Sequence, residues 1–97
     1  MREHEFIWDD EKNRINIRKH GVSFEEAWTV FNDDFVIYFA DEEHSQEEER
    51  FIVLGRSTQQ RLLVVCHCYR ENNELIRIFS ARKANKIETN NYYGGAI

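Results

Sequence analysis

The residues best suited to chemistry lie in the second half of the chain, where arginines recur between apolar runs. From Arg50 to Ile97 there are eight Lys/Arg against three Asp/Glu, whereas the stretch from Met1 to Glu49 has five against fifteen. The net charge of −5 therefore combines an acidic half with a basic half. A phosphate backbone is attracted by the positive potential close to it and not by the net charge of the whole protein. The basic half therefore remains a candidate for binding RNA although the net charge is negative.

The cationic side chains of this half could act together on a phosphate. Arginine and lysine donate charge-assisted hydrogen bonds to phosphate oxygens, and several of them could stabilise the charge of a pentavalent transition state. A single such residue is more often a solvated surface charge, so the hypothesis is that they converge. The predicted catalytic charge stabilisers are Arg61, Arg70, Arg82 and Lys83, and the predicted RNA-binding residues are Arg56, Arg77 and Lys86.

His67 is the predicted general base. Alternation along a strand from Arg61 to Tyr69 places His67 on the same face as Arg61. Nearby arginines would lower the pKa of the imidazole and keep it neutral, as a general base requires. A histidine that is simply buried in the sheet is an equally good interpretation. His20 and Tyr93 are reserve candidates.

Neither a metal site nor a cofactor is expected. In Cys66-His67-Cys68 the spacing is too short for a usual zinc pair, and the imidazole points away from both thiols. The chain also has no Gly-rich phosphate loop, G-x-S-x-G or H-E-x-x-H motif. These patterns favour metal-independent chemistry. Two closely spaced cysteines, with no apolar run of about 20 residues and no signal-like N-terminus, predict a cytoplasmic protein with no membrane segment.

A single α+β domain, residues 1–97, must position these groups. The predicted order is β-α-α-β-β-β-β-α, with strands at 4–8, 35–39, 50–56, 61–69 and 75–80. A helix at 9–21 is indicated by the acids Asp9-Asp10-Glu11 at its start and Gly21 at its end, and a helix at 23–31 by a capping box of Ser23 and Glu26. A last helix is predicted from 81 to about 92, capped by Ser80. The connections 57–60 and 71–73 are short enough to require antiparallel hairpins. Residues 41–49 form an acidic loop, and the even-numbered side chains of 62–70 are predicted to face the core.

Several blocks of the sequence, in order, resemble the BrnT toxins of bacterial type II toxin–antitoxin systems over Phe6 to about Tyr93. The blocks are Phe6-Ile7-Trp8-Asp9 with Lys12-Asn13, Lys19-His20-Gly21-Val22-Ser23-Phe24-Glu25-Glu26-Ala27, Asp41-Glu42-Glu43-His44-Ser45, Glu49-Arg50-Phe51, Gly55-Arg56-Ser57, Arg61-Leu62-Leu63-Val64-Val65, and Ile76-Arg77-Ile78 with Ser80-Ala81-Arg82-Lys83-Ala84. The long strand departs from the family: it ends in Cys68-Tyr69-Arg70 where relatives often have Thr-Glu-Arg. If that glutamate is a base in relatives, its role here falls to His67, Glu49 or an oriented water.

The resemblance implies a RelE-like fold with an antiparallel meander, a ribonuclease activity that blocks translation, and a BrnA-type antitoxin. That antitoxin would bind operator DNA through a ribbon-helix-helix domain, so the toxin itself would meet DNA only through its partner. The expected reaction is attack of the ribose 2′-hydroxyl, which distinguishes RNA from DNA, on the adjacent phosphate. The alternative is a non-catalytic protein-binding module, because arginine and aromatic residues are enriched at interfaces. A DNA-binding regulator is disfavoured, since no predicted helix is strongly basic with helix-turn-helix spacing.

Overall fold

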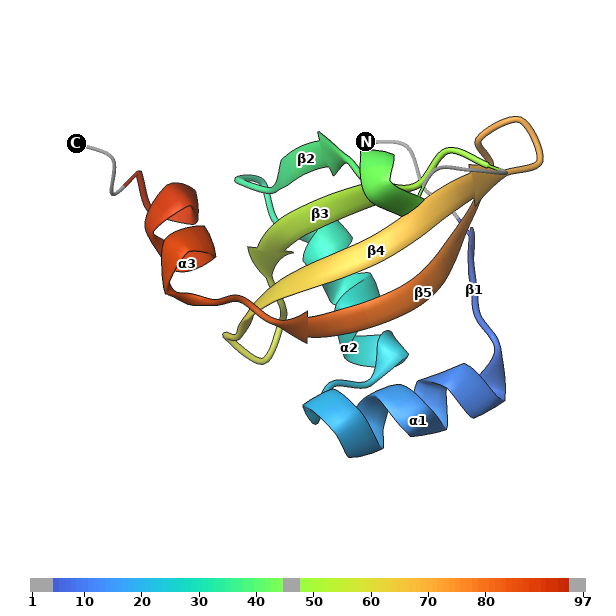
Figure 1. Cartoon of the computed structure of the whole chain (residues 1–97), viewed down its shortest axis with the longest axis horizontal. Helices are drawn as coiled ribbons and strands as arrows, with labels where there is room; N and C mark the ends of the chain where they lie inside the picture. The colour runs from blue at the N-terminus through green and yellow to red at the C-terminus, as the bar shows by residue number, and fades with distance from the viewer. Residues whose placement is uncertain (1–4, 45–47, 95–97) are drawn as a thin grey trace.

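A five-stranded sheet with helices on one side organises the chain, as the computed structural model of residues 5–44 and 48–94 shows (Figure 1). The elements are β1 (Glu5–Ile7), α1 (Asp10–His20), α2 (Phe24–Thr29), the 3-10 turn η1 (Val30–Asn32), β2 (Ile37–Ala40), the 3-10 turn η2 (Glu42–His44), β3 (Phe51–Arg56), β4 (Leu62–Arg70), β5 (Leu75–Lys83) and α3 (Lys86–Tyr92). In Figure 1, α2 crosses behind the sheet, while η2 lies on the side facing the viewer. The two sides of the sheet therefore have different surroundings.

Local signals fix both helices near the N-terminus. The Asp9 side chain accepts a hydrogen bond from the Lys12 amide at the start of α1, and Gly21 ends that helix with φ of 69°. The Ser23 side chain accepts from the Glu26 amide and caps α2. The predicted capping box is only half formed, because the Glu26 carboxylate turns away from Ser23 and binds Arg61 and Ser57.

The sheet is mixed, and the expectation of a purely antiparallel meander is wrong at one edge. Its strand order is β1-β5-β4-β3-β2. Strands β2 to β5 do form an antiparallel meander, with β3 and β4 paired from Phe51–His67 to Arg56–Leu62. Strand β1, however, pairs parallel with β5. The chain passes from β1 through α1 and α2 to the opposite edge and returns through β2, β3 and β4 to β5, so hairpin spacing does not reveal this pairing.

The core lies on the side of the sheet that α1 and α2 cover, and the prediction for the faces of β4 was inverted. Leu63 and Val65 are fully buried in the cluster with Val22 of the α1–α2 connection and with Phe24 and Ala27 of α2. The alternate residues, among them Val64 and Cys66, face the other side. Both sets are apolar, so alternation separates the two faces without showing which one the helices cover.

The last predicted helix begins later than expected. Strand β5 continues to Lys83, and α3 begins at Lys86 with a capping box formed by Asn85 and Glu88. The side-chain amide of Asn16 donates to the Ala81 carbonyl at 2.7 Å and accepts from the Ala81 amide at 3.1 Å. Residues 81–83 pair with β4 in the sheet, so Ser80 does not cap a helix here, and Arg82 and Lys83 lie on a strand.

Candidate active site on the open sheet face

We call the side of the sheet opposite α2 the open face. It contains a hollow of about 420 Å³ between β3, β4, β5 and the η2 turn. The residues that line this hollow are Lys12, Asp41, Glu43, His44, Arg50, Ile52, Val64, Cys66, Phe79, Ser80 and Arg82. Their side chains give the hollow an apolar floor of strand residues with cations and carboxylates around it.

Asp41 and His44 form a carboxylate–imidazole pair at one wall of the hollow. The His44 Nδ1 atom lies 3.1 Å from Asp41 Oδ1 and 3.0 Å from Oδ2. The Asp41 side chain is 9% exposed and that of His44 is 58% exposed. Because an ionised carboxylate only accepts hydrogen bonds, Nδ1 must carry the proton, which leaves the Nε2 lone pair to accept one. This is the geometry of an oriented general base.

Cys66 supports the same carboxylate from the floor of the hollow. Its thiol lies 3.5 Å from Asp41 Oδ2. Burial, with a further contribution from the Asp41 charge, raises the pKa of the Cys66 thiol to about 11. The thiol therefore stays protonated at neutral pH and can donate to Asp41, and it is not a thiolate nucleophile.

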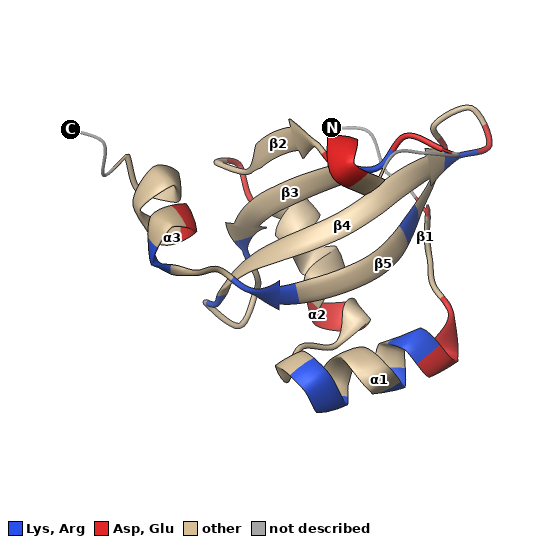
Figure 2. Ribbon diagram, viewed as in Figure 1, with Lys and Arg blue, Asp and Glu red and all other residues tan. Residues whose placement is uncertain are grey.

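Three cations reach the hollow from different elements. Lys12 comes from α1, Arg50 precedes β3, and Arg82 lies near the end of β5. Arg82 is held by two hydrogen bonds to the Glu88 carboxylate, from Nη1 at 2.9 Å and Nη2 at 2.8 Å. The Arg82 guanidinium, with a smaller contribution from the Asn85 amide at the helix cap, holds the pKa of Glu88 below its usual value, although desolvation acts in the opposite direction. The α3 helix thus fixes the direction of Arg82, and Figure 2 shows this basic end of β5 beside α3.

His67 lies on the opposite side of the sheet, away from the hollow. Its residue is 0% exposed, and its ring contacts Phe31, Phe51 and Tyr69 at centroid distances of 4.9, 6.2 and 5.3 Å. Burial lowers the pKa of His67 to about 4. The direction agrees with the expectation, but the cause is desolvation, since the rings that surround it are aromatic and not arginines. In this position His67 cannot touch a phosphate.

Arg61 and Arg70 are each held by a carboxylate elsewhere. Arg61 Nε donates to Glu26 Oε2 at 2.9 Å, and its Nη2 donates to Glu26 Oε1 and to the Gly21 carbonyl. This guanidinium, followed by the Ser57 hydroxyl, lowers the pKa of the buried Glu26. Arg70 lies at the other end of β4, where it pairs with Glu48 at 3.1 Å. The predicted convergence of Arg61, Arg70 and Arg82 does not occur.

The remaining predicted residues are divided between the two sides of the sheet. Lys83 lies opposite the core residue Leu63 and therefore points to the helix-covered side. Arg77 lies on the open face of β5, with its guanidinium carbon 5.9 Å from the centre of the Phe79 ring. Arg56, at the end of β3, contacts Gln60 and the Tyr93 hydroxyl. Lys83 and Lys86 are exposed on either side of the β5–α3 connection.

The reserve candidates lie apart. His20, in the last turn of α1, lines a cavity of about 210 Å³ that shares Lys12, Phe79 and Ser80 with the hollow. Tyr93 follows α3, where it accepts from Arg56. Of the predicted residues, then, only Arg82 lines the hollow, with Arg77 and His20 next to it.

The Asp41–His44 pair is the feature that sequence reasoning missed. The two residues are three apart in a segment interpreted as a solvated acidic loop. The η2 turn brings them onto one side, and the Asp-x-x-His spacing was the available clue. Across residues 5–44 and 48–94, no three His, Cys, Asp or Glu side chains gather as a candidate metal site, and no helix is long and apolar enough to cross a membrane.

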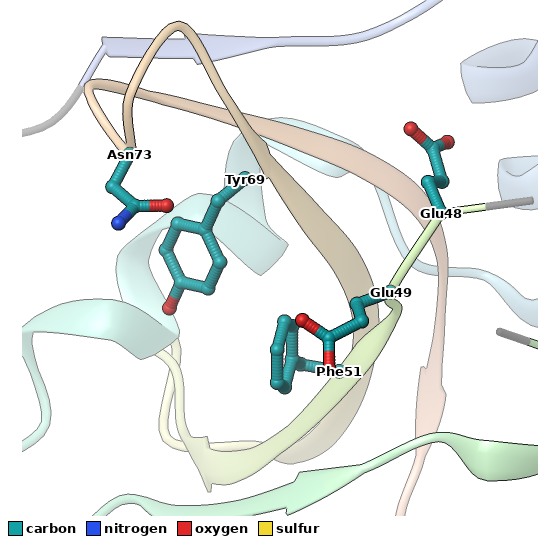
Figure 3. Close-up of a pocket in the computed structure, with 5 residues that line it drawn as sticks. All are labelled: Glu48, Glu49, Phe51, Tyr69 and Asn73. Atoms are coloured by element: carbon teal, nitrogen blue, oxygen red, sulfur yellow. The ribbon is translucent and has the colours of Figure 1, made fainter.

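A second cavity, of about 540 Å³, lies at the far end of the sheet (Figure 3). It is lined by Glu48, Glu49, Phe51, Tyr69 and Asn73. Figure 3 shows the Tyr69 hydroxyl and the Asn73 amide directed into the space, with the Glu49 carboxylate beside Phe51. Its lining contains two carboxylates and no cation, so this cavity is unfavourable for a phosphate. Glu49, one of the alternative bases, therefore lies away from the cations of the open face.

Comparison with known proteins agrees with this architecture. Residues 8–88 match the profile of a family described as the ribonuclease toxin BrnT of type II toxin–antitoxin systems. The structure is similar to the crystal structure of the Brucella abortus ribonuclease toxin BrnT, with a TM-score of 0.65 and 21% sequence identity. That similarity covers 87% of this chain and 100% of the Brucella chain. No curated protein sequence matches the chain significantly.

Proposed function

Since the chain belongs to the BrnT family of ribonuclease toxins, we propose that it cleaves RNA in the hollow of the open face, without a metal ion. The observation that carries this proposal is the Asp41–His44 pair beside Arg50, Arg82 and Lys12. It combines an oriented base with a set of cations, which are the two components that cleavage by a 2′-hydroxyl needs.

In the proposed reaction, His44 Nε2 takes the proton of a ribose 2′-hydroxyl. The 2′-oxygen then forms a bond to the adjacent phosphorus, and the bond from phosphorus to the 5′-oxygen of the next nucleotide breaks. Arg82 and Lys12 stabilise the negative charge of the phosphoryl oxygens, and water protonates the leaving 5′-oxygen. The products are a 2′,3′-cyclic phosphate and a 5′-hydroxyl end.

The test is incubation of the purified protein with single-stranded RNA in EDTA, followed by analysis of the new ends. We expect cleavage in the chelator and cyclic phosphate ends, because the base and the charge stabilisers are both side chains. A DNA strand of the same sequence should stay intact, since it has no 2′-hydroxyl. Activity that disappears with EDTA and returns with a divalent ion would contradict the metal-free mechanism.

We extend the proposal to the biological setting. Cleavage of cytoplasmic RNA would inhibit translation, and a BrnA-type antitoxin with a ribbon-helix-helix domain would neutralise the toxin and carry it to operator DNA. The family membership and the similarity of the fold to the Brucella toxin support these steps, and we propose a RelE-like type for that fold. An acidic antitoxin segment on the open face would meet Arg77 and Arg82, so the association rate should fall as salt rises.

The alternative is a binding module without catalytic activity. It is favoured by exposed aromatic side chains near the edge strand β2, where Phe35 is 76% exposed and Tyr38 is 53% exposed. The RNA incubation separates the two functions. A binding module would leave RNA intact, and the His44→Gln variant would then behave like the wild-type protein.

A further inference from the structure

We propose that Phe79 and Arg50 form a stacking platform for one base of single-stranded RNA, next to the Asp41–His44 pair. This inference rests on the proposed function for its substrate and adds a subsite to it. The platform would place the ribose and phosphate of the bound nucleotide in the part of the hollow that contains His44 and Arg82. It would thus determine which part of an RNA chain is presented for cleavage.

A β-bulge directs Phe79 into the hollow. Cys66 of β4 lies opposite Ser80, whereas the next residue, His67, lies opposite Ile78, so Phe79 has no partner across the ladder. As a result, Phe79 and Ser80 both line the hollow although they are neighbours in sequence. Bulges re-aim side chains in this way, often beside functional sites. The irregularity gives the open face an aromatic ring where regular alternation would give only one of these two residues.

The Arg50 guanidinium lies over this ring, so the two groups can act together. The guanidinium carbon of Arg50 is 3.9 Å from the centre of the Phe79 ring, and that of Arg77 is 5.9 Å away. The backbone of Arg50 is fixed, because its carbonyl accepts from the Asp41 amide at 2.8 Å. The same hydrogen bond connects the platform to the residue that orients His44. Both aromatic rings and guanidinium planes are surfaces on which unpaired bases stack.

The chemistry of the hollow favours a base over a second phosphate at this position. A phosphate needs cations, which Arg82 and Lys12 supply without an aromatic ring. A partly buried ring that lines the hollow together with Ile52 and Val64, and that has the Arg50 guanidinium against it, instead provides a surface for stacking. Stacking on such a surface tolerates every base, since each base has a π face. The platform therefore predicts dependence on the presence of a base rather than on its identity.

The experiment uses 2′-O-methyl hexanucleotides, which bind without being cleaved because they lack a free 2′-hydroxyl. Affinity is measured by fluorescence anisotropy for the intact strand and for six strands that each contain one abasic nucleotide. With the wild-type protein we expect one abasic position to weaken binding about fivefold or more. The Phe79→Ala variant should bind the intact strand more weakly than the wild-type protein does, by the same factor. Removing the base at that position should not weaken binding to the variant any further.

Phe35→Ala is the matched control, because Phe35 is an exposed phenylalanine that does not line the hollow. Its affinities should equal those of the wild-type protein. The proposal is overturned if no abasic position weakens wild-type binding, or if Phe79→Ala weakens the intact and abasic strands by equal factors. If binding depends on the base but the protein does not cleave RNA, the proposed reaction is contradicted and the stacking platform is still supported.

Discussion

The two sides of the sheet each carry a histidine, and their surroundings are opposite. His67, on the helix-covered side, is enclosed by aromatic rings with no exposed surface. His44, on the open face, is oriented by a carboxylate and remains largely exposed. The same contrast holds for the arginines, since Arg61 binds the buried Glu26 whereas Arg82 lines the hollow. Polar groups on the covered side hold the folded chain together, whereas Asp41, His44 and Arg82 line a hollow that a ligand could enter.

Replacing Arg61 should give the largest loss of stability, because Arg61 pairs with a buried carboxylate on the helix-covered side. The Glu26 side chain is 2% exposed, and Arg61→Ala leaves its carboxylate without a counter-charge. We expect a loss of about 3 kcal/mol in the free energy of unfolding, measured in urea. If stability is unchanged and RNA cleavage is lost, Arg61 is catalytic and the division between the two sides is wrong.

Arg82→Gln tests the open face. Removing a cation that stabilises the developing phosphoryl charge should lower the cleavage rate about 100-fold. Because Arg82 also binds Glu88, the Glu88→Gln variant serves as the control for loss of the ion pair alone. Cleavage by Glu88→Gln should stay near the wild-type rate. Equal losses in both variants would mean that α3 positioning, and not the guanidinium charge, is responsible.

The buried His67, on the helix-covered side, should make the stability of the protein depend on pH. The pKa of His67 in the folded protein is about 4, below its ordinary value of 6.5. Between these values the unfolded chain binds a proton that the folded protein does not, so stability is full above pH 6.5 and falls as the pH falls towards 4. The protonation of His67 contributes at most about 1.4 kcal/mol per pH unit to the slope of the free energy of unfolding against pH.

Thermal unfolding of wild type and His67→Leu between pH 7 and pH 4.5 measures this slope. The variant should lose the share of the slope that His67 contributes. Because both proteins carry the same carboxylates, protonation of those groups cancels in the comparison. An unchanged slope in His67→Leu would assign the effect to another group.

Arg70→Ala should have the smallest effect of the series. Its ion pair with Glu48 joins side chains that are 41% and 37% exposed. Such a pair contributes less than about 1 kcal/mol, so stability and cleavage should both change little. A cleavage defect in Arg70→Ala would place the far end of β4 in the active site and would contradict the assignment of the active site to the hollow.

Local patterns in the sequence predicted much of the fold. The Asp9 and Ser23 caps, Gly21 and the short hairpin connections located the helices and the meander. The parallel pairing of β1 depends on a contact between distant segments, which no local pattern encodes. The end of β5 depends likewise on Asn16, whose amide binds Ala81 from 65 residues away in sequence.

The site was less predictable for the same reason. Alternation separated His67 from Cys66, but two apolar faces gave no means of deciding which one the helices cover. The Glu26 carboxylate that holds Arg61 is 35 positions away in sequence, and the bulge at Phe79 follows from strand register. Only Asp41 and His44 were close enough in sequence to be found, and their acidic surroundings suggested a solvated loop instead.

The most direct test is the single-turnover rate of RNA cleavage by two histidine variants, His44→Gln and His67→Leu, at a temperature where both are folded. We expect His44→Gln to lose about 100-fold or more, as loss of a general base does. His67→Leu should retain the wild-type rate within a few-fold, since its ring touches only the core. A defect confined to His67→Leu, with His44→Gln fully active, would contradict the assignment of the active site to the open face.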